Sequence, residues 1–182
     1  MKSKKILLAL VLIIIVLSII LIEKPFSSKD SIQKIDSKTL KDVGLKVGDV
    51  APDFSLVDTS DNVIKLSEFR VQKAVIINFW ASWCTACVSE MPMLQEVSQN
   101  YKDSIVVLGV NRQESKRDAV KFAYSIGVSF PLLLDKDRKV NDLYHVINLP
   151  VTYFVNKDGF ITGLKYGELS REELYKYIDD LV

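Results

Sequence analysis

Residues 74–87 have the sequence AVIINFWASWCTAC, in which a nearly continuous apolar run leads into two cysteines three positions apart. An apolar run of this kind is typical of a central strand that is covered on both faces. The residues from about Cys84 to Tyr101 favour a helix that is interrupted near Pro92, because proline cannot donate a backbone hydrogen bond. This stretch therefore predicts a buried strand followed by a helix, with the cysteine pair at the start of the helix.

The predicted position of the two cysteines points to thiol–disulfide exchange. The N-terminus of a helix has free N–H groups and a partial positive charge, which stabilise a thiolate and lower its pKa. Cys84 is expected to be the exposed nucleophile, and Cys87 lies one turn further into the helix. Cys87 can then attack the mixed disulfide on Cys84 and release the partner.

Other uses of a cysteine pair fit this sequence less well. A zinc site needs four ligands, and the chain can add only His145 and carboxylates to the two cysteines. Covalent haem attachment needs a histidine after the second cysteine, where this chain has Val88. A purely structural disulfide would close a very small loop and so would stabilise the fold little. We therefore expect a redox-active pair with neither a metal nor a cofactor.

The rest of the chain alternates strand patterns with helix patterns, which predicts an α/β fold in one domain. Strands are expected at residues 54–57, 63–66, 105–110, 130–134, 152–155 and 160–166, and helices at residues 114–126 and 139–146 and from Ser170 onward. Turn residues at 58–62 and 156–159 predict that the strands on either side of them form hairpins.

The N-terminus carries an apolar segment that is separate from this domain. Fifteen of the seventeen residues at 6–22 are Leu, Ile or Val, and three lysines precede them. As a helix rising ~1.5 Å per residue the segment spans roughly 25 Å, enough to cross a membrane, and the lysines predict that the following chain is exported. A cleaved signal peptide is the alternative, but no small-x-small site follows the run. The expected organisation is a cytoplasmic N-terminus at 1–5, a transmembrane anchor at 6–22, a tether at 23–41 and a domain at 42–182.

The charge of the chain gives no indication of a polyanionic partner. Its 24 basic and 23 acidic residues give a net charge of +1. Residues 38–182 hold 18 basic and 20 acidic residues, a net charge of −2. A strongly basic nucleic-acid binder is therefore excluded as the default interpretation.

Three segments of the chain carry a family resemblance: NFWASWCTAC at residues 78–87, VAPDFSL at 50–56 and NLPVTYF at 148–154. They resemble the TlpA/ResA-like membrane-anchored thiol–disulfide oxidoreductases of the thioredoxin superfamily, and the resemblance covers about residues 45–182 in the same order. It implies a thioredoxin-like fold, in which a central mixed sheet is flanked by helices and carries an N-terminal hairpin extension.

The resemblance also implies roles for residues outside the cysteine pair. Pro150 would follow a cis peptide bond and lie beside the sulfurs, and the backbone of Leu149 would pair with an extended substrate segment. Glu90, three residues after Cys87, would assist proton transfer to and from the thiols. A solvated glutamate on the helix surface is the alternative for Glu90. Thioredoxins have a buried aspartate where this chain has Asn78, and because an amide cannot shuttle a proton, this difference supports a role for Glu90.

We make separate predictions for five further positions. Trp83 directly precedes the nucleophile and is expected on the surface that contacts the partner, whereas Trp80 is expected in the core. His145 is expected to have a structural or surface role. The dipeptide at 85–86 tunes the redox potential in this fold, and its sequence Thr-Ala leaves the potential of this pair open.

By resemblance, the expected function is reduction of disulfides in exported proteins, with apocytochrome c as a candidate substrate. A membrane protein of the CcdA/DsbD type would re-reduce the pair. A disulfide-introducing oxidase on the same scaffold is the main alternative. A peroxiredoxin-like peroxidase is disfavoured because Ala81 and Ile77 stand where that branch needs Thr or Ser and a proline. An anchored binding module with a spectator disulfide is the non-enzymatic alternative.

Overall fold

The computed structural model describes residues 44–181. The predicted cytoplasmic N-terminus, anchor and tether at 1–41 lie outside the described residues, as does residue 182. Within residues 44–181, no helix has the length and apolar character that crossing a membrane requires.

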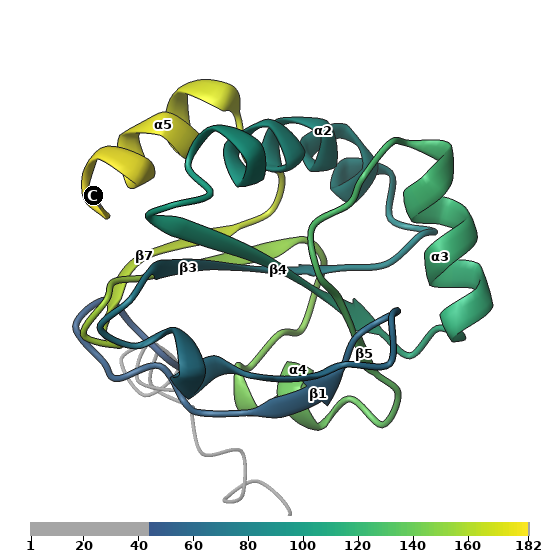
Figure 1. Cartoon of the computed structure of the whole chain (residues 1–182), viewed down its shortest axis with the longest axis horizontal. Helices are drawn as coiled ribbons and strands as arrows, with labels where there is room; N and C mark the ends of the chain where they lie inside the picture. Colours follow the sequence, from purple (N-terminus) through teal and green to yellow (C-terminus); the bar gives the residue numbers. More distant parts are fainter. Residues whose placement is uncertain (1–43, 182) are drawn as a thin grey trace, which may run out of the picture. The chain divides into compact units, whose positions relative to one another are not determined.

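A five-stranded mixed sheet forms the centre of the domain (Figure 1). Its strands, in spatial order, are β5 (Leu132–Asp135), β4 (Ile105–Arg112), β3 (Ala74–Trp80), β6 (Val151–Val155) and β7 (Ile161–Tyr166). β3, β4 and β5 are parallel, whereas β6 is antiparallel to β3 and β7 is antiparallel to β6. A separate hairpin of β1 (Ser55–Val57) and β2 (Val63–Lys65) precedes the sheet, so the predicted mixed sheet and hairpin extension are confirmed.

Helices cover both faces of this sheet. They are η2 (Leu66–Phe69), α2 (Thr85–Asn100), α3 (Lys116–Ser125), α4 (Lys139–Leu143) and α5 (Arg171–Asp179). Figure 1 shows α2 and α5 on one face, with α4 and β1 on the opposite face. The buried side chains form two apolar clusters: one joins the sheet to α2, α3 and α5, and the other joins it to α4 and the hairpin.

The side chains of β3 alternate between these two clusters, and β3 is buried along its whole length. Ile76 and Trp80 belong to the cluster under α2, which confirms that Trp80 is a core residue, whereas Ile77 and Phe79 belong to the cluster above α4. Because side chains alternate along a strand, Asn78 lies on the same side as Ile76 and Trp80. A polar amide is thereby placed in the core directly beneath α2.

The predicted interruption of the helix near Pro92 is wrong. α2 continues from Thr85 to Asn100 with Pro92 inside it. Proline removes only the hydrogen bond to the carbonyl of residue 88, and the buried side chains of Met91, Leu94 and Val97 hold the helix against the sheet.

Two other predicted helices are shorter in the structure. α3 begins at Lys116 rather than 114, because the side chain of Ser115 accepts a hydrogen bond from the Asp118 N–H and caps the helix. α4 ends at Leu143 rather than 146, and His145 has a positive φ of 54° that a helix cannot contain.

The topology brings several loops to one edge of the sheet. β3, β4 and β5 end at this edge because they are parallel, and the antiparallel β6 begins there. The loop after β3 contains Cys84, and the loop before β6 contains Pro150. The carboxyl edge of the parallel strands is the usual place for a functional site in α/β sheets.

Candidate active site

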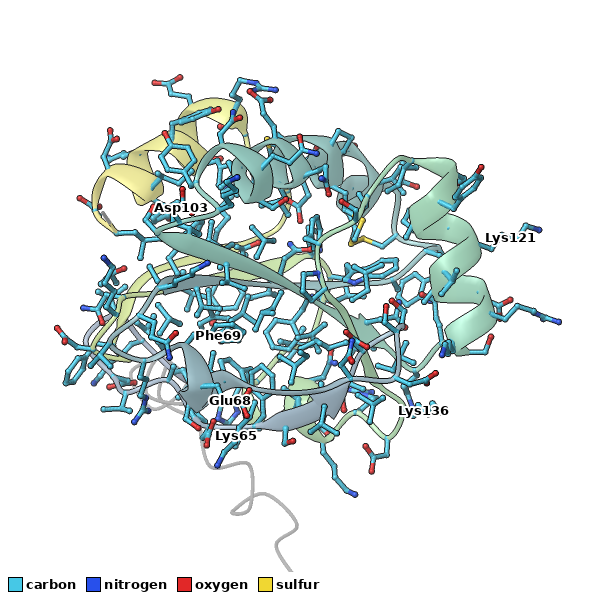
Figure 2. The ribbon with its side chains drawn as sticks, in the orientation of Figure 1. Lys65, Glu68, Phe69, Asp103, Lys121 and Lys136 are labelled. Atoms are coloured by element: carbon cyan, nitrogen blue, oxygen red, sulfur yellow. A yellow bond between two sulfur atoms is a disulfide. The ribbon has the colours of Figure 1, made fainter. Side chains whose placement is uncertain are left out.

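The two cysteines occupy the first turn of α2. Cys84 is the N-cap residue, and its Sγ accepts a hydrogen bond from the backbone N–H of Cys87 at 3.2 Å. A disulfide joins the two residues, and Figure 2 shows it in yellow beneath the end of α2 that lies towards α3. Cys84 is 7% exposed and Cys87 is fully buried. Cys84 is therefore buried in the oxidised protein rather than exposed as predicted, although it is the more accessible of the two cysteines. Its role as the nucleophile stays a prediction.

Glu90 lies on the same helix and is almost completely buried, with 1% of its surface exposed. Its Oε1 accepts a hydrogen bond from the Asn78 side-chain N–H at 2.6 Å, and its Oε2 accepts one from the Leu169 backbone N–H at 2.9 Å. The alternative of a solvated surface glutamate is therefore wrong. Burial raises the pKa of Glu90 to about 7, although the two hydrogen bonds favour the charged form. Near neutral pH this carboxyl group can both hold and release a proton.

Asn78 links Glu90 to the sheet. Its side-chain N–H groups donate to Glu90 and, at 3.0 Å, to the hydroxyl oxygen of Thr152. Asn78 and Thr152 are register partners on β3 and β6, so the sheet pairing sets this contact. The sequence singled out Asn78 and Glu90, but it gave no signal for Thr152 or for the Leu169 backbone, because these residues are distant along the chain.

The residues implied for substrate contact lie at the same edge of the sheet. The Leu149–Pro150 peptide bond is cis, as the resemblance implies, and Pro150 is buried. Within residues 44–181, neither the N–H nor the C=O of Leu149 takes part in a hydrogen bond. Trp83 is 67% exposed directly before Cys84. Backbone groups of Leu149 and the ring of Trp83 are therefore available to a partner.

Glu114 fixes the loop before the cysteines, a contact that the sequence did not reveal. One carboxylate oxygen of Glu114 accepts from the Ser82 N–H at 2.8 Å and from the Asn111 side chain at 2.6 Å, and the other accepts from the Ser82 hydroxyl. This interaction ties the loop after β4 to the loop after β3. In the sequence, the polar residue Ser82, two positions before Cys84, was the one indication of a polar contact at this loop.

The fold and the cysteine pair together define a thioredoxin-fold thiol–disulfide oxidoreductase. Residues 47–163 match the AhpC/TSA family model, and the chain belongs to this family. The chain is 35% identical over 136 residues to thiol-disulfide oxidoreductase ResA of Geobacillus kaustophilus, covering 74% of this chain and 78% of the relative. It is 34% identical over 142 residues to thioredoxin-like protein YneN of Bacillus subtilis, covering 76% and 82% of the two chains.

Solved structures agree with this assignment. A Chlorobium tepidum protein assigned as thiol:disulfide interchange protein DsbE superposes with a TM-score of 0.69 and 29% identity, covering 75% of this chain and 97% of that one. The thioredoxin domain of a thiol-disulfide oxidoreductase from Bacteroides vulgatus gives a TM-score of 0.66 and 27% identity, with the same coverage of the two chains. The predicted thioredoxin-like fold and thiol–disulfide oxidoreductase activity are thereby confirmed.

The buried carboxyl group of Glu90 predicts a stability that depends on pH. The pKa of Glu90 is about 7 in the folded protein and has the ordinary value of 4.5 in the unfolded chain. At a pH between these two values, the folded protein keeps a proton on Glu90 that the unfolded chain has released. The favourable contribution is complete below the unfolded pKa and is lost as pH rises through the folded pKa, by roughly 3 kcal/mol at most. The free energy of unfolding of the oxidised protein should therefore fall between pH 5 and pH 8.

Glu90→Gln should remove most of this fall, because a glutamine does not titrate. Urea denaturation of the oxidised wild type and the variant at both pH values measures the difference, and other titrating groups cancel in the comparison. An equal fall in both proteins would show that Glu90 has an ordinary pKa.

Proposed function

We propose that this protein reduces disulfides in exported proteins at the outer face of the cell membrane. The thiolate of Cys84 attacks one sulfur of the substrate disulfide and forms a mixed disulfide, and the other substrate sulfur leaves as a thiol. Cys87 then attacks Cys84, which restores the Cys84–Cys87 disulfide and releases the second substrate thiol. Two electrons pass from the cysteine pair to the substrate. One proton comes from the Cys87 thiol, and the other is the proton that Cys84 released when it formed its thiolate.

The surroundings of the cysteine pair support the direction of this reaction. A strongly oxidising pair is one whose reduced form is stabilised, as happens when nearby groups favour the thiolate. Here the Cys84 sulfur accepts a hydrogen bond from the Cys87 N–H and lies at the N-terminus of α2. The two residues between the cysteines, Thr85 and Ala86, carry no charge. A charged Glu90 on the next turn disfavours a second negative charge on the pair. The observation that carries the proposal is therefore a cysteine pair with two uncharged residues between its members, near the buried carboxyl group of Glu90.

The sequence supports the proposed location and partners. The lysines before the apolar segment at 6–22 support a membrane anchor with the domain on the outer side of the membrane. By the resemblance to ResA-like proteins, oxidised haem-attachment motifs of apocytochrome c are candidate substrates. A membrane electron donor of the CcdA/DsbD type would return the pair to its reduced form.

Thiol labelling of intact cells tests both direction and location. The chain has only two cysteines, so a membrane-impermeant maleimide reports on this pair alone. We expect Cys84 to be labelled on intact cells without added reductant, because a reductase is kept reduced, and the Cys84→Ser/Cys87→Ser variant gives the background. Labelling only after a reductant is added would indicate the alternative oxidase. Labelling only after lysis would contradict the outward location.

A further inference from the structure

A groove of about 950 Å³ lies beside the loop that contains Pro150. This cis-proline groove is lined by residues 145–151, Arg112, Arg138, Asp142, Tyr166 and Gly167. Arg112 ends β4, and Tyr166 ends β7, so the groove opens at the carboxyl edge of the sheet. Thus Leu149 and Pro150 belong both to the groove and to the loop implied in substrate contact.

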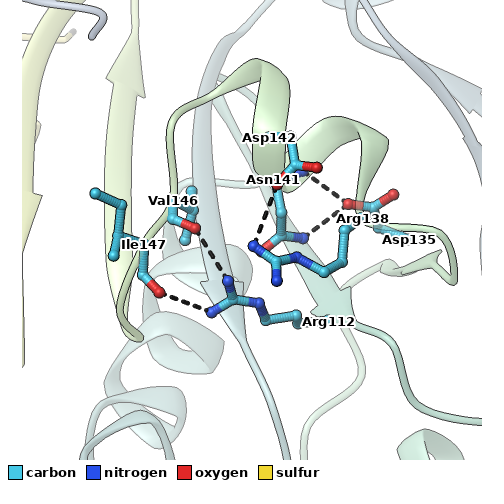
Figure 3. Close-up of polar contacts among 7 residues, drawn as sticks. All are labelled: Arg112, Asp135, Arg138, Asn141, Asp142, Val146 and Ile147. Atoms are coloured by element: carbon cyan, nitrogen blue, oxygen red, sulfur yellow. Dashed lines mark hydrogen bonds and ion pairs between the residues drawn. The ribbon is translucent and has the colours of Figure 1, made fainter. Parts of the chain in front are cut away.

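Arg112 holds one wall of the groove. Its Nη1 donates to the carbonyl of Ile147 and its Nη2 donates to the carbonyl of Val146, both at 3.1 Å (Figure 3). Within residues 44–181, Arg112 forms no ion pair with a carboxylate. Burial and the neighbouring Arg138 guanidinium lower the pKa of Arg112, and the nearby carboxylates of Asp142 and Asp135 partly offset this.

Arg138 is only weakly engaged by acidic groups. Its Nη2 donates to Asp142 at 3.2 Å, but the two side chains are 37% and 66% exposed, and exposed pairs of this kind contribute little to stability. The Nε of Arg138 is buried and has no hydrogen-bond partner within the described residues. The nearby carboxylate of Asp135 is turned to Asn141, whose backbone and side-chain N–H groups both donate to it at 2.7 Å (Figure 3).

The lining of the groove therefore has a net positive charge, whereas the domain as a whole has a net negative charge. The lining holds two arginines and one aspartate, whereas residues 38–182 carry a net charge of −2. The exposed side chains of Ile147 and Tyr166 add apolar surface at the rim. Such a lining fits an extended segment with apolar side chains and one acidic side chain.

We propose that the cis-proline groove binds a glutamate or aspartate side chain of the substrate segment that lies along Leu149, with Arg138 as the main donor to that carboxylate. This inference rests on the proposed function, because it assigns the substrates of the same site. The free N–H and C=O of Leu149 align the segment, and Arg112 positions the loop through its two carbonyl contacts. An incoming carboxylate can replace Asp142 on Arg138 because that pair is exposed and weak.

Matched disulfide peptides test this proposal on the full-length protein. Each peptide is acetylated and amidated, so that no terminal carboxylate is present, and carries a single Glu at one position near the cysteine. Its partner peptide has Gln at that position. At the position that reaches the groove, we expect kcat/KM to be about tenfold higher for Glu than for Gln, as a charge-assisted hydrogen bond allows.

Variants near the groove show whether Arg138 causes this preference. Arg138→Gln should reduce the Glu/Gln ratio to near one, and Arg138→Lys should keep part of it. Lys136→Gln is the matched control, because Lys136 is exposed two residues away, outside the groove lining, and its variant should keep the full ratio (Figure 2). Arg138 has a positive φ of 62°, so Arg138→Asn provides a second neutral variant whose side chain tolerates this backbone.

Binding of the same peptides with serine in place of cysteine separates this proposal from the proposed function. If neither disulfide peptide is reduced but the Glu form binds the oxidised protein more tightly in an Arg138-dependent way, the groove assignment stands and the reductase proposal fails. Equal rates and equal binding for Glu and Gln peptides at every position would overturn the groove assignment. A preference that Arg138→Gln leaves unchanged would also overturn it.

Discussion

Cys87→Ser should convert the protein into a trap that remains covalently attached to its substrate through Cys84. Cys84 is the more accessible of the two cysteines, since it is 7% exposed at the N-cap of α2 and Cys87 is fully buried. Without Cys87 the mixed disulfide has no internal thiol to resolve it. Non-reducing electrophoresis and mass spectrometry after incubation with a disulfide peptide should show one peptide on Cys84 for nearly every protein molecule.

Cys84→Ser is the matched control for this experiment. It removes the accessible nucleophile and leaves only the buried thiol of Cys87, so exchange should fall to the uncatalysed background and no adduct should accumulate. If Cys84→Ser formed an adduct on Cys87 as readily, the roles assigned to the two cysteines would be reversed. If neither variant formed an adduct, the exchange mechanism itself would be contradicted.

Glu90→Gln should slow disulfide exchange by about 100-fold at pH 7, the lower end of what a general acid–base group contributes. Glutamine keeps the size and can still accept the hydrogen bond from the Leu169 N–H, but it cannot take up or release a proton. Burial gives the wild-type carboxyl group a pKa of about 7, so its loss should also flatten the rate profile between pH 5 and pH 9. Stopped-flow measurement of exchange with a disulfide peptide across this range gives both results.

Glu96→Gln is the control for the change in charge. Glu96 lies on the same helix, but its carboxylate is exposed and pairs with Arg171 at 2.8 Å. This variant should keep the wild-type rate and profile. A Glu90→Gln profile that matches the wild type would show that Glu90 takes no part in proton transfer.

Local sequence patterns predicted the part of the site that depends on neighbours along the chain. The apolar run at 74–80 and the cysteines that follow it predicted the buried strand and the helix start, but the first cysteine is buried rather than exposed. Alternation along β3 is also a local property, yet the sequence alone did not show which face Asn78 would join. The uninterrupted passage of α2 through Pro92 depends on buried contacts with the sheet, which outweigh one lost hydrogen bond.

Contacts between distant segments could not be predicted in this way. Sheet register brings Thr152 to Asn78, and the chain entering α5 brings the Leu169 N–H to Glu90. The contact of Glu114 with Ser82 likewise joins two loops that meet only at the edge of the sheet. For Glu90 the sequence left a surface role and a role in proton transfer open. The structure decides between them because Glu90 is buried and contacts Asn78 and Leu169, which are distant along the chain.

The reduction potential of the Cys84–Cys87 pair tests the central claim of a disulfide reductase most directly. It can be measured on the full-length protein in detergent by equilibration with glutathione or dithiothreitol buffers and alkylation of the thiols. The proposed function predicts a value near or below about −250 mV, towards the ~−270 mV of thioredoxin. A value towards ~−120 mV, as in strongly oxidising pairs, would contradict it and make the protein a disulfide donor.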